Sequence, residues 1–61
     1  MPWSEDYYPR SMNHLPDHVR RKAIDIANAL LAEGMEEGTA IRIAIAKAKT
    51  WAQQHHQWPY E

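Results

Sequence analysis

Two apolar segments of helical period, joined by a short connection with two glycines, constrain this chain more than any other feature. Pro16 suits the first position of a helix, and Gly34 stands where left-handed backbone closes many helices. The sequence therefore predicts a helix over residues 16–33. Between the two markers, apolar side chains recur at spacings of three and four residues and form one stripe: Val19, Ala23, Ile26, Ala27, Leu30 and Leu31.

The second segment, "AIRIAIAKAK", is compatible with two patterns. Ile41, Ile43 and Ile45 alternate as in a strand. The alanines in this segment and just after it favour a helix and are depleted in strands: Ala40, Ala44, Ala46, Ala48 and Ala52. We therefore predict a helix over residues 37–54. Its apolar stripe at helical spacing is longer than the strand pattern: Ile41, Ala44, Ile45, Ala48, Trp51 and Ala52.

The chain has 61 residues and no cysteine, so neither a disulfide nor a thiolate metal site can supplement its small core. The two helices carry mainly small and aliphatic apolar residues, whereas most of the aromatic residues lie outside them. We therefore predict an all-α single domain over residues 1–54. It is an antiparallel two-helix hairpin with an N-terminal aromatic arm, residues 1–15, packed against it. Residues 55–61 form a polar, mobile tail in this prediction.

The arm is expected to reach across the hairpin and to supply the bulk that the helices lack. A short helical turn is predicted around residues 11–15. Ile24 and Ile43 fall off the main stripes of the two helices, which indicates that something covers the flanks of the hairpin. The anchors expected in the arm are Trp3, Tyr7 or Tyr8, Pro9 and Met12.

The connection "AEGMEEGTA" is interpreted as a joint between helices and not as a ligand site. A phosphate-binding loop needs a Lys-Ser/Thr pair at the helix start, but Glu36 and Glu37 occupy that place and would repel phosphate. A calcium loop needs alternating oxygen ligands over about twelve residues. Gly34 is expected to end the first helix, and Gly38 to let the first turn of the second helix approach its neighbours closely.

Neither metal binding nor catalysis is predicted. His14 and His18 have a spacing of four residues, but Pro16 lies between them and no third ligand is near in the sequence, whereas a metal site needs three or four converging ligands. The hydroxyl residues lack a neighbouring group that would activate them as nucleophiles. We therefore expect no cofactor, no metal and no enzymatic activity.

Charge disfavours a role in nucleic-acid binding. The net charge is −1, so the chain lacks the overall positive field that attracts phosphates. A helix-turn-helix is also disfavoured, because the second helix opens with two glutamates where base-reading side chains would stand. The cluster Arg20-Arg21-Lys22 fans out over different helix faces, and Arg21 and Lys22 are expected to pair with Asp25 or Asp17.

Membrane insertion is not predicted either. The longest apolar-rich stretch, residues 40–52, is too short and contains three cationic side chains. No leader sequence is visible at the N-terminus. The expectation is a cytoplasmic protein.

Four segments, "MPW", "DYYPRSM", "LPDHVRRKAIDIANALLAEG" and "EGTAIRIAIAKAKTWA", resemble a group of short, uncharacterised bacterial proteins over residues 1 to about 52. More distantly, the chain is similar to the ChaB family. There a Leu-Pro precedes the first helix, as at residues 15–16, and a Thr-Ala leads into an alanine-rich helix, as at residues 39–40. This resemblance implies a small helical fold and regulation of cation transport. The chain departs from the family at Ile45, where a tryptophan is expected, and in its shorter connection.

The leading functional hypothesis is a small protein-interaction or regulatory module that binds a protein partner or a second copy of itself. The predicted contact residues are Ile24, Arg42, Ile43 and Lys49. The alternative is a nucleic-acid-associated protein, and a third possibility is a ChaB-like regulator of a transporter. The cations available to the nucleic-acid alternative are Arg20, Arg21, Lys22, Arg42 and Lys49.

Overall fold

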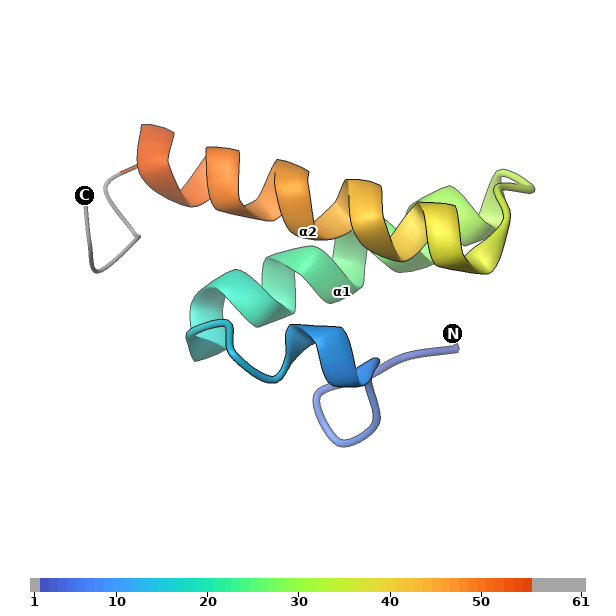
Figure 1. The fold of residues 1–61 in the computed structure, drawn as a ribbon, viewed down its shortest axis with the longest axis horizontal. Helices are drawn as coiled ribbons and strands as arrows, with labels where there is room; N and C mark the ends of the chain where they lie inside the picture. Colours follow the sequence, from blue (N-terminus) through green and yellow to red (C-terminus); the bar gives the residue numbers. More distant parts are fainter. Residues whose placement is uncertain (1, 56–61) are drawn as a thin grey trace.

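The computed structural model describes residues 2–55 and contains three helical elements. A 3-10 turn, η1, spans Arg10–Met12, and the two α-helices are α1, Asp17–Ala32, and α2, Glu37–Gln54. Figure 1 shows α1 and α2 running antiparallel along one another, with the arm and η1 lying below α1 in that view. The predicted all-α helical hairpin is confirmed. α1 is one residue shorter at each end than the predicted range, and the bounds of α2 coincide with it.

The seam between the helices is built from small side chains. Four alanines of α2 recur every fourth residue, so they lie along one line of the helix, and each is fully buried. Small residues at this spacing leave little side-chain volume between the helices, so most of the bulk in the core has to come from elsewhere. The buried residues of the seam are Val19, Ala23 and Ala27 of α1 and Ala40, Ala44, Ala48 and Ala52 of α2.

The arm supplies that bulk. Trp3 is 7 % exposed, and Met12 and Leu15 are fully or almost fully buried in the same cluster as the seam. Tyr8 packs against the cluster as a half-buried residue, whereas Tyr7 points away and is 72 % exposed. The expected packing of the arm is therefore found, with Tyr8 as the tyrosine that contributes.

Local hydrogen bonds shape the arm. The backbones of Ser4 and Tyr7 exchange two hydrogen bonds, of 2.8 and 3.2 Å between N and O, and reverse the chain. Pro9 then precedes η1, and its carbonyl accepts from the Met12 amide at 2.9 Å. The helical turn begins one residue before the range predicted for it and ends within that range. It begins there because Pro9 presets the backbone for the first turn.

Asn28 attaches the arm to α1. Its Oδ1 accepts from the backbone amide of Trp3 at 3.2 Å, and its Nδ2 donates to the carbonyl of the same residue at 3.0 Å. The side chain therefore satisfies both backbone groups of a residue that is buried under the hairpin. Asn28 is itself 6 % exposed, whereas the helical pattern places it on the polar side of α1. The arm explains the difference, because it covers that side.

Gly34 ends α1 with φ at +98°, as the sequence predicts. The amide of Met35 donates to the carbonyl of Leu30 at 3.1 Å, and the amide of Gly34 donates to the carbonyl of Leu31 at 3.0 Å. These are the two hydrogen bonds of a Schellman motif, which needs a left-handed residue at this position.

Glu36 caps the start of α2. Its Oε1 accepts from the backbone amide and from the hydroxyl of Thr39, both at 3.0 Å. The role expected for Gly38 is wrong: a Cβ there would meet only the Glu36 carboxylate at 3.5 Å and the Arg42 guanidinium at 3.9 Å, which are ordinary contacts. No neighbouring element approaches this glycine closely enough to require it.

The two glycines should respond to alanine in opposite directions. Gly38→Ala should raise the free energy of unfolding by about 0.5–1 kcal/mol, because alanine is the better helix former and its Cβ fits. Gly34→Ala should lower it by about 1 kcal/mol, because its left-handed backbone strains any residue with a Cβ. Urea denaturation followed by circular dichroism measures both. A loss of stability in Gly38→Ala would show that a close contact exists after all.

The Glu36 cap makes stability depend on pH. Hydrogen bonds from the backbone and hydroxyl of Thr39, with a further contribution from the backbone of Gly38, lower the pKa of Glu36 below its ordinary value of 4.5. The stabilisation is therefore fully present above that ordinary pKa and is lost as the pH falls through the lowered one.

Glu36→Gln should flatten the acid side of a plot of melting temperature against pH, because glutamine keeps an acceptor but carries no titrating charge. Melting curves between pH 7 and about pH 3 measure the effect. Glu37→Gln is the matched control, since it removes a charge one residue further along without altering the cap. An acid slope unchanged by Glu36→Gln would exclude the cap as its source.

Candidate interaction surface

The structure separates the four predicted contact residues. Ile24 is 5 % exposed and belongs to the core cluster that contains Trp3 and Met12, so the prediction that it contacts a partner is wrong. The physical reason is the arm, which covers the side of α1 that carries Ile24. The other three lie on α2: Arg42 is exposed, and Ile43 and Lys49 are half-buried.

Arg20 holds the arm in place. Its Nη1 donates to the carbonyl of Leu15 at 2.8 Å, and its Nη2 forms an ion pair with Asp17 at 2.5 Å. The guanidinium also lies over the ring of Tyr8, at 4.9 Å from the ring centre. A cation over an aromatic face is attracted by the electrons of the ring. Arg20 thus contacts Tyr8 and Leu15 of the arm and Asp17 of its own helix.

The other two cations of the α1 cluster also have intramolecular partners. Arg21 forms an ion pair through Nε with Glu5 of the arm, at 3.2 Å. The Lys22 ammonium lies 5.3 Å from the ring centre of Trp51 on α2. The predicted pairing of Arg21 and Lys22 with Asp25 or Asp17 is therefore replaced by contacts with the arm and with α2. All three cations of the cluster therefore have contacts within the molecule, although the exposed Arg21–Glu5 pair adds little stability.

The cations of α2 are arranged differently. Arg42, Lys47 and Lys49 form no ion pair with a carboxylate in the part of the chain from residue 2 to residue 55. α2 contains no acidic residue after Glu37, so the charge of its outer side is positive throughout. Arg42 makes a long contact of 3.5 Å with the Thr39 hydroxyl.

We call this region the outer α2 face and define it by Arg42, Ile43, Ala46, Lys47, Lys49 and Thr50. The buried alanines fix which side of α2 points inward, and at 3.6 residues per turn these six lie on or near the other side. Ile43, Ala46 and Thr50 follow one another at spacings of three and four. Arg42 and Lys49 flank that line on one side and Lys47 on the other. A shallow groove of about 430 Å³ lies at its C-terminal half, lined by Ala46, Lys47, Thr50, Trp51 and Gln54.

A second groove of about 540 Å³ lies where the arm meets the polar side of α1. It contains one charged side chain, Asp25, and its floor includes Asn28, which is already paired with the arm. The groove is therefore a product of the docking of the arm. Its lining residues are Pro2, Asp25, Asn28, Ala29, Leu31 and Ala32.

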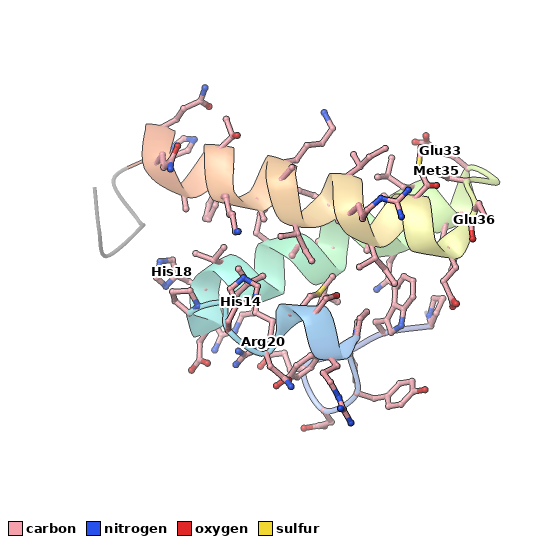
Figure 2. All side chains as sticks on the ribbon, in the orientation of Figure 1. His14, His18, Arg20, Glu33, Met35 and Glu36 are labelled. Carbon is pink, nitrogen blue, oxygen red and sulfur yellow. The ribbon has the colours of Figure 1, made fainter. Side chains whose placement is uncertain are left out.

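Figure 2 labels side chains at the two ends of the hairpin. His14, His18 and Arg20 lie at the end where α1 begins, and Glu33, Met35 and Glu36 lie around the connection at the other end. Within residues 2–55, no group of three or more histidines and carboxylates is placed to hold a metal ion.

Neither described helix is long and apolar enough to cross a membrane. The predicted mobile tail and its aromatic residues, Trp58 and Tyr60, lie outside the described residues except for His55.

The chain is similar to a bacterial protein of unknown role. It is 60 % identical over 53 residues to the uncharacterised protein YdaT of Bacillus subtilis (strain 168). The similarity covers 87 % of this chain and 35 % of YdaT, so the chain spans about a third of the length of that relative. The predicted resemblance to uncharacterised bacterial proteins is supported in this way.

No protein-family model matches the chain, and the resemblance to ChaB stays a prediction. No solved structure matches the chain.

Proposed function

We propose that the chain is a small, non-enzymatic interaction module that binds a protein partner in the cytoplasm through the outer α2 face. The observation that carries the proposal is the unequal use of the cations. Arg20 and Arg21 of α1 form ion pairs and Lys22 lies over the ring of Trp51, whereas Arg42, Lys47 and Lys49 form no ion pair within residues 2–55. These three cations surround a line of small and apolar side chains, and in the described chain only Arg42 has a carboxylate nearby, that of Glu36.

The nucleic-acid alternative has less support. Three of the five cations that it needs, Arg20, Arg21 and Lys22, hold the arm or α2 and would have to break those contacts to reach phosphates. A small regulator of a transporter remains the third candidate, and it rests on the resemblance to ChaB alone.

Site-specific photocrosslinking in the source cell tests the proposal. Ala46 on the outer α2 face and Ala29 on the polar side of α1 are both exposed alanines, so they make a matched pair for a photoreactive amino acid. We expect a discrete protein adduct from position 46 and none from position 29. Adducts from both positions, or from neither, would contradict an interaction surface on α2.

A gel shift with duplex DNA at low salt tests the alternative, because phosphate contacts are strongest at low ionic strength. We expect no retardation. Retarded DNA, lost again in Lys47→Glu, would favour the nucleic-acid alternative over the proposal.

A further inference from the structure

We infer that the segment recognised by the outer α2 face is an acidic amphipathic helix of another protein. The inference rests on the proposed function and adds the chemistry of the partner. Three properties of the face lead to it: its shape, the placement of its charges, and the poor fit of a second copy of this chain.

The shape suits a helix. The line of Ile43, Ala46 and Thr50 follows spacings of three and four residues along a helix of 18 residues. Ala46 and Thr50 are exposed and have short side chains, which allow another helix to approach closely, and Ile43 offers a half-buried apolar contact at one end. Amphipathic helices dock onto such lines through anchors at the same spacing.

The charges specify the flanks of that helix. Arg42 and Lys49 lie on one side of the line and Lys47 on the other, and none forms an ion pair within residues 2–55. In addition to the hydrogen bonds of the cap, the charge of Arg42 acts on the Glu36 carboxylate and helps to lower its pKa, so the two lysines are the cations with no carboxylate nearby in the described chain. A partner helix with an apolar centre and acidic residues on both edges would place carboxylates opposite these cations. Complementary charges of this kind increase the rate of association and select against wrong partners.

A second copy of this chain fits poorly. A two-fold pairing centred on the outer α2 face places its cations against one another, and the six residues of the face include no carboxylate to offset them. Like charges placed together across an interface are destabilising. The partner is therefore a different, acidic chain.

Nucleic acid fits less well than an acidic helix for another reason. Its phosphates would pair with the three cations but would leave Ile43 and the small residues without an apolar partner.

The test uses the full chain, labelled with ¹⁵N, and two synthetic helical peptides. One peptide has leucines at helical spacing flanked by glutamates, and in the other every glutamate is replaced by glutamine. We expect the acidic peptide to shift amide resonances within residues 39–50 and to bind at least about tenfold more tightly than the glutamine peptide at low salt. Its affinity should fall as salt is added.

Matched variants assign the effect to the face. Lys47→Glu should weaken the acidic peptide about tenfold. Arg10→Glu makes the same change of net charge at an exposed residue of the arm and should leave the affinity unchanged. Ile43→Ser should weaken both peptides, because it removes the apolar contact. Circular dichroism confirms that each variant is folded.

The outcomes separate the inference from the proposed function. Equal binding of both peptides at residues 39–50 would overturn the acidic partner and keep the interaction surface. A photocrosslinked protein from position 46 with no binding of the acidic peptide would likewise overturn the acidic partner and keep the interaction surface. Shifts of amide resonances elsewhere in the chain would also overturn the inference, and so would an equal loss of affinity in Arg10→Glu. A DNA duplex that binds the outer α2 face where the acidic peptide does not would replace the acidic helix with nucleic acid as the ligand.

Discussion

Trp3→Ala should lower the free energy of unfolding by about 3–5 kcal/mol, the range found when a buried tryptophan is truncated. The buried residues of the seam between the helices are mostly alanines, whose side chains are too short to extend into the space that the indole leaves. A domain of this size has about 5 kcal/mol of stability or less, and much of the population should therefore be unfolded at 25 °C. Thermal melts followed by far-ultraviolet circular dichroism measure the loss.

Tyr7→Ala is the matched control, since it truncates an aromatic residue of the same arm that is 72 % exposed. Its effect should stay within about 0.5 kcal/mol, as for other surface substitutions. Deletion of residues 1–10 should lower the melting temperature at least as much as Trp3→Ala, because it removes Tyr8 as well. An unchanged melt in either the deletion or Trp3→Ala would reject the role of the arm in the core.

Asn28→Ala should cost about 2–4 kcal/mol, because it leaves the buried amide and the carbonyl of Trp3 without the side chain that pairs with both. Hydrogen exchange gives a direct measurement. The Trp3 amide should be protected in the parent chain and should exchange much faster in the variant. Asp25→Ala, at an exposed position of the same helix, is the control. It should change neither the free energy of unfolding nor the exchange rate of the Trp3 amide by a comparable amount.

A double variant provides a further check. Trp3→Ala and Asn28→Ala both loosen the same docking of the arm, so their combined cost should be smaller than the sum of the two single costs. Full additivity would mean that the hydrogen bonds and the indole stabilise the fold independently, which would contradict a single docking event.

The periodicity of the sequence predicts the hairpin well because it is a local property. The alanine and isoleucine pattern of residues 40–52 is resolved in favour of a helix by propensity, and Gly34 marks the end of α1 through the backbone geometry that its position requires. Neither conclusion depends on contacts between residues distant in the sequence.

Ile24 and Asn28 show where this kind of reasoning stops. Both lie beside the main stripe of α1, and only the docking of an arm about 25 residues away in the sequence decides that they are buried. For Asn28 the signal was misleading, because an amide in a helix usually faces water unless a backbone segment comes to pair with it. Ile43 carries the same off-stripe signal as Ile24, but it lies on the other helix and outside the core cluster.

The charged residues were predictable only in part. A cluster such as Arg20-Arg21-Lys22 is expected to fan out around a helix, but its partners Tyr8, Glu5 and Trp51 come from other elements. The Glu36 cap has a weak local signal in the three-residue spacing to Thr39. Glutamate is not among the favoured capping residues, so that spacing alone did not identify it.

The alanine seam has a consequence for binding. Alanine has no side-chain rotamers to lose, so the alanines between α1 and α2 become buried without loss of side-chain entropy. Side-chain entropy is lost instead where Trp3 and Met12 of the arm and Arg20 of α1 become fixed. The outer α2 face lies on a helix that packs on the rest of the fold through alanines, so a partner of the proposed kind would meet a backbone that is already helical.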